Sequence, residues 1–208
     1  MGHIPSAETC ELDILSFQDA LDKSQPICHM GDKDWIYYPN FYSDYRYVLG
    51  TVGKRPVVTI GINPSTAEPD RPDRTVSSVE RHVLDNGFDS FIMFNVYAQR
   101  ATKPTDMDQR FNLQLHQENM KALRWILKNT HGQPVIWAAW GTNIGRRPYL
   151  ADCLKDIVAI GKEFDARWVR IGALTKEGHP RHPLYLRNGL EFEDFAVDSY
   201  VSGLLKHA

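Results

Sequence analysis

Four apolar runs of six or seven residues stand out in the hydrophobic pattern of this chain. They are rich in β-branched and aromatic residues, which is typical of buried strands. The runs cover residues 57–62, 90–96, 134–140 and 167–173. The sequence therefore predicts four buried strands.

The segments around these runs carry apolar residues three and four positions apart, which predicts helices. The predicted helices cover residues 12–21, 75–86, 113–129, 144–160 and 195–205. We expect Asp73 to cap the second of them and Gly87 to end it, whereas Pro148 limits where the fourth begins. Aromatic and polar residues alternate over 42–51, which predicts an edge strand.

Strands that alternate with helices of this length predict an α/β fold. We expect a three-layer α/β/α arrangement with a central, mostly parallel, four-stranded sheet. No linker-like composition divides the chain, so residues 1–208 are predicted to form a single domain. Within it, 1–53 provides an N-terminal lead-in and edge elements, 54–187 the core, and 188–208 a closing C-terminal helix.

The composition excludes several classes of protein. Apolar residues make up 42% of the chain and charged residues 24%, as in ordinary globular proteins. No apolar run has the length of a membrane span, and the start lacks the pattern of a signal peptide. Cys10, Cys28 and Cys153 are odd in number and far apart, which argues against a disulfide framework. We expect a cytoplasmic protein with no membrane partner and no obligate protein partner.

The charges are unevenly distributed, although the net charge is only −2. Residues 54–187 carry 20 Lys and Arg against 14 Asp and Glu, while both flanking segments are acidic. An ordinary solvated surface explains any single cation, but their gathering in predicted loops favours an anionic partner such as DNA. The loop cations are Arg71, Arg74, Arg100, Lys103, Arg146, Arg147, Lys176, Arg181 and Arg187.

Unusual residues follow each predicted strand. Asn63 follows the first, Asn95 ends the second shortly before Tyr97, and His182 lies in the loop after the fourth. The carboxyl ends of parallel strands meet at one edge of a sheet, where ligands bind. We therefore expect a pocket of amides, imidazole and aromatic faces there. A purely local role for Asn63, as a turn residue before Pro64, is the alternative.

The motifs of several enzyme classes are missing. The chain shows no carboxylate pair of the glycosidase kind, no Gly-x-Ser-x-Gly elbow and no glycine-rich phosphate loop. His179 and His182 lie three apart without a further ligand at a usual spacing, so no metal or organic cofactor is expected. What remains is a neutral amide pocket with imidazole and cations, which suits a heterocyclic base.

The four motifs resemble those of the uracil-DNA glycosylase superfamily. Gly61-Ile62-Asn63-Pro64 resembles the first motif of the mismatch-specific branch, and Met93-Phe94-Asn95 the strand whose Asn reads a pyrimidine. Residues 139–141 (Ala-Trp-Gly) match a Leu-Trp-Gly strand, and 182–184 (His-Pro-Leu) the start of a His-Pro-Ser-Pro-Leu motif. Leu184 stands where that motif has Ser, and Ser65-Thr66 follows neither branch.

A closer match is to a bacterial family of uncharacterised proteins. Its marks are Leu-Asn-Pro-Ser-Thr-Ala, Asn-x-(Phe/Tyr)-Ala-x-Arg-x-Thr, Ala-Ala-Trp-Gly and Pro-Arg-His-Pro-Leu-Tyr-Leu. This chain carries nearly all of them at residues 62–67, 95–102, 138–141 and 180–186.

The resemblance implies an enzyme that hydrolyses the N-glycosidic bond of a flipped base in DNA. Asn63 would orient the attacking water, and His182 would stabilise the departing base. The base-binding residues would be Asn95, Tyr97 and Ser65, and the phosphate ligands Arg100, Lys176, Arg181 and His179. An ion pair of Arg100 with Asp70 or Asp73 is the alternative for that residue.

The substrate base is left open: uracil, a mismatched base and a hypermodified base such as those of phages all fit. Two other functions stay open as well. One is a binding module for nucleic acid or a nucleotide that lacks the chemistry, and the other is a hydrolase of a free nucleoside or nucleotide.

Overall fold

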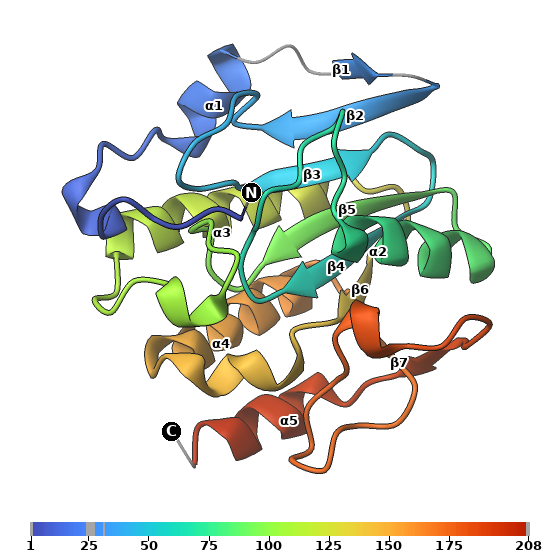
Figure 1. The fold of residues 1–208 in the computed structure, drawn as a ribbon. Helices are drawn as coiled ribbons and strands as arrows, with labels where there is room; N and C mark the ends of the chain where they lie inside the picture. The colour runs from blue at the N-terminus through green and yellow to red at the C-terminus, as the bar shows by residue number, and fades with distance from the viewer. Residues whose placement is uncertain (1, 24–27, 31, 207–208) are drawn as a thin grey trace.

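The four predicted strands form the parallel centre of one larger sheet (Figure 1). A computed structural model of the protein describes residues 2–23, 28–30 and 32–206. The parallel strands lie in the order β5-β4-β6-β7. Their bounds are Pro56–Gly61 for β4, Ser90–Asn95 for β5, Val135–Ala138 for β6 and Arg167–Ile171 for β7. The α/β class and the parallel centre are therefore confirmed.

Antiparallel strands extend the sheet on both sides, so the predicted number of four strands is wrong. Over the described residues the sheet has eight, in the order β1-β2-β3-β5-β4-β6-β7-β8. The segment 42–51 does contain a strand, but β3 lies between β2 and β5 rather than at the edge. The antiparallel strands are β1 (Cys28–Met30), β2 (Lys33–Tyr38), β3 (Val48–Thr51) and β8 (Phe192–Asp194). Of these, only β3 lies in a segment whose alternation predicts a strand.

Five α-helices occur in the described residues, and each overlaps a predicted range, although α1 begins five residues later than the predicted 12–21. They are α1 (Phe17–Lys23), α2 (Arg74–Asp85), α3 (Leu113–Lys128), α4 (Tyr149–Glu163) and α5 (Val197–Leu204). Among them, none combines the length and the apolar character that crossing a membrane requires. Short 3₁₀ segments complete the chain: Thr9–Glu11, Pro104–Asp106, Gly141–Arg146 and Pro183–Tyr185.

The starts of α2 and α4 follow from local chemistry. Asp73 is the N-cap of α2, and its Oδ1 accepts a hydrogen bond from the N–H of Val76 at 2.9 Å, as expected of a capping carboxylate. Pro148 is the N-cap of α4. Proline cannot continue a helix from the preceding turn. The helix predicted over 144–160 therefore begins only at Tyr149.

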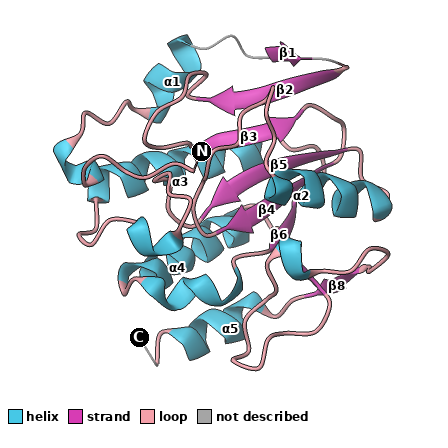
Figure 2. Cartoon of the chain, in the orientation of Figure 1, coloured by secondary structure: helices cyan, strands magenta, loops and turns pink. Residues whose placement is uncertain are grey.

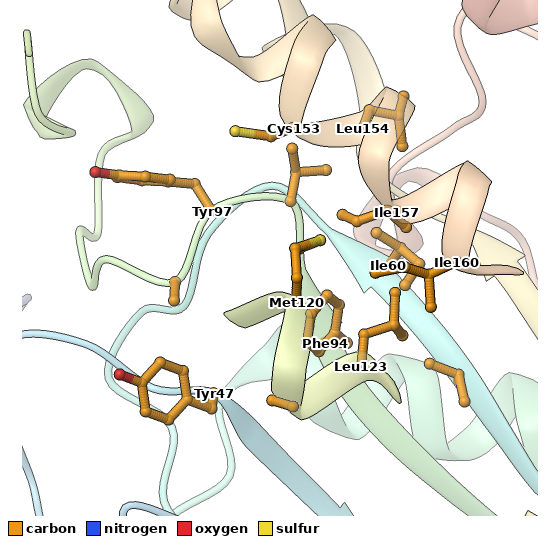
Figure 3. Close-up of a cluster of buried hydrophobic side chains, with 14 of the residues drawn as sticks. Tyr47, Ile60, Phe94, Tyr97, Met120, Leu123, Cys153, Leu154, Ile157 and Ile160 are labelled. Atoms are coloured by element: carbon orange, nitrogen blue, oxygen red, sulfur yellow. The ribbon is translucent and has the colours of Figure 1, made fainter. Parts of the chain in front are cut away.

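Helices cover both faces of the sheet, and the core is divided accordingly (Figures 1 and 2). α1, α3, α4 and α5 pack on one face, whereas α2 and the segment leading to β8 pack on the other. Along β5, Ile92 and Phe94 enter the larger cluster, and Phe91 and Met93 enter the smaller one. This division reflects the alternation of side chains along a strand. Figure 3 shows the larger cluster, where side chains of β4 and β5 meet those of α3 and α4.

A buried carboxylate ties the N-terminal residues to the loop after β5. Asp108 accepts hydrogen bonds from the backbone N–H and the hydroxyl of Thr9, and the first of these measures 2.9 Å. It also accepts from the hydroxyl of Tyr97 and the Nε2 of Gln99, both at 2.8 Å. All four residues are buried. The loop that carries the second motif is therefore held at both ends, by β5 and by Asp108.

Candidate functional site

A pocket of about 400 Å³ lies at the edge where the four parallel strands end. Its walls come from the loop after each strand and from the first turn of α2. Asn63, Asn95, Trp140 and His182 line it, one from each of the four motifs. The volume lies within the range of about 300–1,000 Å³ that is usual for small-molecule sites. The structure thus brings together motifs that are up to 119 residues apart in the chain.

The loop backbone holds the side-chain amide of Asn63. Its Nδ2 donates to the carbonyl oxygens of Pro64 at 2.9 Å and of Ala101 at 2.7 Å. Both amide hydrogens are then used, and in the described part of the chain no donor reaches Oδ1. Because Asn63 is only partly buried, this oxygen can accept a hydrogen bond from a water or ligand in the pocket. The turn role and a pocket role are therefore compatible.

Asn95 is buried at the end of β5 and has an unpaired donor. Its side chain is only 2% exposed, and over the described residues its Nδ2 has no hydrogen-bond acceptor. A buried donor without a partner costs about 1–3 kcal/mol, so an acceptor atom on a ligand would stabilise this arrangement. Gly61, its neighbour across β4 and β5, makes room for the amide: a Cβ there would lie 2.9 Å from Oδ1 of Asn95.

The imidazole of His182 is oriented by its own loop. Nδ1 accepts a hydrogen bond from the N–H of Leu184 at 3.3 Å, which leaves the proton of the neutral ring on Nε2. Burial lowers the pKa of His182, and the negative charge of Asp73 opposes this effect in part. The neutral ring therefore offers the pocket an N–H donor, which suits a group that accumulates negative charge.

The position of Tyr97 does not fit the predicted base-binding role, because its side chain is 0% exposed and does not line the pocket. Its ring lies against that of Tyr149, with centroids 5.0 Å apart. Gln99, two residues after Tyr97, is buried as well, and both side chains donate to the carboxylate of Asp108. Tyr185, 77% exposed on the pocket wall with its ring 6.0 Å from that of His182, is the better stacking candidate.

Arg100 holds the first motif loop from behind and is not placed to bind phosphate, which corrects the prediction. It is fully buried, and its guanidinium donates to the carbonyl oxygens of Ser65 and Ala67 and lies 4.4 Å from the ring centre of Tyr42. Neither of the aspartates considered as partners forms an ion pair with it within the described ranges. Ser65 itself lies in the pocket wall, where its Oγ is 3.1 Å from Oγ1 of Thr102.

The other predicted phosphate ligands lie outside the pocket. Nδ1 of His179 is 2.8 Å from the hydroxyl of Tyr200, and both residues line a separate cavity of about 710 Å³. Nε of Arg181 donates to the carbonyl of Ala173 at 2.8 Å, and Lys176 is exposed in the loop after β7. These residues are therefore available only for contacts beyond the pocket.

Three charged residues of the pocket wall were not predicted as site residues: Arg46, Asp73 and Arg74. Asp73 was recognisable as the cap of α2, but its place on the wall was not. Arg46 lies in the alternating segment before β3, and no feature of that segment indicates a site. Its place depends on the chain passing beside Ala67, whose carbonyl oxygen accepts a hydrogen bond from Nη1 of Arg46 at 3.1 Å.

Histidine and acidic residues do not gather into a metal centre in the parts of the chain that the structure describes. His179 and His182, three apart in the sequence, diverge: the first bonds Tyr200, and the second lines the pocket. The pocket therefore offers amide, imidazole and guanidinium groups to a ligand, together with one carboxylate.

Comparison with known proteins identifies a family. The family model described as "Protein of unknown function (DUF1643)" matches residues 46–184. The searches of curated proteins and of solved structures give no match. The matched range begins at Arg46, includes Asn63, Asn95 and His182, and covers more than half of the 208 residues. The chain therefore belongs to the DUF1643 family, whose function is unknown.

Proposed function

We propose that the protein is a DNA glycosylase-like enzyme that hydrolyses the N-glycosidic bond of a flipped base. The observation that carries this proposal is the convergence of three polar groups on one pocket. They are the free amide oxygen of Asn63, the unpaired buried amide of Asn95 and the imidazole of His182. Flipped bases are read by hydrogen bonds to their edges, which such groups supply. The resemblance of the motifs to the uracil-DNA glycosylase superfamily supports the same reaction.

In the proposed reaction, Oδ1 of Asn63 accepts a hydrogen bond from the attacking water and orients its oxygen toward C1′ of the sugar. A C1′–O bond forms, the C1′–N bond breaks, and its electron pair leaves with the base. An amide is a poor base, so the proton of the water passes to solvent, and the base later takes a proton from solvent. Most of the rate enhancement then comes from stabilising the departing anion, to which Nε2–H of His182 donates.

Asp73 has a complementary role in this proposal. Positive charge develops on the sugar as a glycosidic bond breaks. The carboxylate of Asp73 lines the same pocket, and its hydrogen bond to the N–H of Val76 holds it in position. It can therefore offset the charge on the sugar while His182 offsets the charge on the base.

The mouth of the pocket carries exposed apolar groups that fit a nucleic-acid partner. Leu184 and Tyr185 are 42% and 77% exposed and follow His182 after one intervening residue, Pro183. Proteins that flip bases stack aromatic groups on the base or insert apolar side chains into the helix. We assign this role to Leu184 and Tyr185 in place of Tyr97, and contacts with phosphates outside the pocket to Lys176 and Arg181.

The test is a panel of oligonucleotides that carry uracil, mismatched bases or modified cytosines, read by release of free base and by alkali-labile sites. The wild-type protein is expected to release at least one of these bases. Asn63→Ala is expected to lower the rate about 100-fold or more, because the water loses its orienting acceptor. Asn188→Ala is the matched control, since Asn188 is exposed and lies outside the pocket.

The outcomes separate the three functions that the sequence leaves open. No base release across the whole panel would overturn the enzyme proposal. Binding of DNA without release, unchanged in Asn63→Ala, would indicate a binding module. Release from free nucleosides or nucleotides, with little dependence on salt, would indicate a hydrolase of monomers, because few phosphates are contacted.

A further inference from the structure

Arg46 is a buried cation of the pocket wall without a carboxylate partner. It is only 2% exposed, and within the described ranges no carboxylate oxygen lies within ion-pair distance of it. Among the residues that the structure describes, its guanidinium donates only from Nη1 to the carbonyl of Ala67, at 3.1 Å, and its Nε has no partner. A guanidinium has five N–H donors, and buried charges are usually paired. Most of the bonding capacity of Arg46 is therefore unused.

Arg100 provides a contrast within the same cluster. It is equally buried, but its guanidinium is shared among the carbonyls of Ser65 and Ala67 and the hydroxyl of Tyr37, the last at 2.9 Å. It does not line the pocket, whereas Arg46 does. Burial lowers the pKa of Arg46 to about 9, and the positive charge of Arg100 contributes to this shift, which leaves Arg46 protonated at neutral pH. Two adjacent cations thus make this end of the pocket electropositive.

The N-terminus of α2 adds to this positive potential. Arg74 and Thr75, the first two residues of this 12-residue helix, line the same pocket. The N–H groups of a first helical turn have no partner within the helix and attract anions. Asp73 is the competing carboxylate, but its Oδ1 is used by the N–H of Val76 and it forms no ion pair with Arg46 over the described residues.

We propose that this end of the pocket is an anion subsite that holds a phosphate group of the nucleotide, with the guanidinium of Arg46 as its main ligand. That the phosphate belongs to a nucleotide rests on the function proposed above. The subsite itself rests on Arg46, Arg100 and α2. Two sources share this chemistry: a phosphodiester of DNA next to the flipped base, and the phosphomonoester of a free nucleotide.

Inorganic phosphate is the first probe, measured by titration calorimetry at constant ionic strength. Wild-type protein is expected to bind it, and Arg46→Gln to bind it about tenfold more weakly or worse, because a charged hydrogen bond is lost. Arg46→Lys keeps the charge but not the planar fork and is expected to lie between them. Arg71→Gln, at an exposed arginine paired with Glu68 outside the pocket, is expected to bind like wild type.

A measurement on wild-type protein covers the case in which the Arg46 variants fail to fold. In amide and guanidinium NMR spectra, phosphate is expected to shift the backbone N–H signals of Arg74 and Thr75 and the Nε–H signal of Arg46. Equal phosphate affinity in folded Arg46→Gln, or a titration that moves none of these signals, would overturn the proposal.

The source of the phosphate is then resolved with two ligands, a nucleoside 5′-monophosphate and a short single-stranded oligonucleotide. Competition of the monophosphate with inorganic phosphate indicates a monoester, and Arg46-dependent binding of the oligonucleotide alone indicates a phosphodiester. Neither readout requires base release. Phosphate binding without base release across the panel would support the anion subsite and contradict the glycosylase function. Base release without phosphate binding would support the glycosylase function and contradict the anion subsite.

Discussion

Gly141 and His182 are in close contact across the third and fourth motif loops. A Cβ at position 141 would lie 3.2 Å from Cβ of His182, and Gly141 has a φ of +64°. A residue with a side chain is strained in that conformation. Glycine at the end of the Ala-Ala-Trp-Gly motif therefore allows the fourth motif loop to approach closely enough for His182 to line the pocket.

Gly141→Ala is expected to lower the free energy of unfolding by about 1 kcal/mol or more and to displace His182 from the pocket. The rate of base release, measured by single-turnover kinetics, should fall by more than the smaller fraction of folded protein explains. Denaturant titration gives that fraction. Gly145→Ala is the control, because position 145 has open space and no positive φ. Equal activity in both variants would show that the position of His182 is unimportant.

Asp73 can be tested by separating its cap from its charge. Asn caps a helix as well as Asp does, so Asp73→Asn should be nearly as stable as wild type, whereas Asp73→Ala should lose about 1 kcal/mol. Removing the carboxylate from beside Arg46 should tighten the binding of inorganic phosphate about threefold. Thermal denaturation and calorimetry check both points. Unchanged phosphate affinity in Asp73→Asn would mean that the two charges do not share a ligand site.

Base release should depend on pH through His182. Burial lowers the pKa of this imidazole, so the neutral form persists down to pH values below 6.5, its ordinary value. Protonation removes the acceptor that holds Leu184, so the rate is expected to be flat around neutrality and to fall only below pH 6.5. A rate profile between about pH 5 and 8 tests this. An acid limb centred above pH 6.5, or the same limb in His182→Gln, would contradict it.

Substitution of Tyr97 should lower the stability of the fold, whereas substitution of Tyr185 should weaken the binding of DNA. Tyr97→Phe removes a donor from the buried carboxylate of Asp108 and should cost about 1–3 kcal/mol of stability. Tyr185→Ala, at an exposed side chain, should change stability by less than about 0.5 kcal/mol but weaken DNA binding about tenfold, as expected for a lost stacking contact. Denaturation curves and fluorescence anisotropy separate the effects. DNA binding that is weakened by Tyr97→Phe and not by Tyr185→Ala would support the predicted base-binding role of Tyr97.

His82 makes the stability of the fold sensitive to acid. It is fully buried in α2 beside Trp137, and over the described residues neither ring nitrogen has a partner. Burial lowers its pKa, so below pH 6.5 the unfolded chain binds a proton that the folded chain does not, and the free energy of unfolding falls. His82→Leu should lose less stability than wild type between about pH 7.5 and 5.5 in urea titrations. An identical loss would assign the effect to other groups.

Much of the pocket was predictable because parallel strands of one sheet have their carboxyl ends at the same edge. Once four buried strands are recognised, their carboxyl ends must meet, so Asn63, Asn95 and His182 were expected at one edge, where the structure places them. No distance between the motifs had to be known.

Arg46 and Tyr97 show what the pattern could not reveal. The place of Arg46 depends on the antiparallel pairing of β2 with β3, whereas the alternation over 42–51 predicts a strand but not its partner. The burial of Tyr97 depends on Asp108, eleven residues later, turning back to meet its hydroxyl. Both outcomes are set by tertiary partners, which local periodicity does not encode.

The hydrogen bonds between Thr9 and Asp108 have a further consequence for any shortened form of this chain. The family match starts at residue 46, yet Asp108 within it takes two hydrogen bonds from Thr9, which lies outside. A chain shortened to the matched range would leave that carboxylate short of two donors and would expose the edge of β3 that β2 now covers. The matched range therefore marks where the chain resembles the family model, and we expect a fragment limited to it to be less stable than the longer chain.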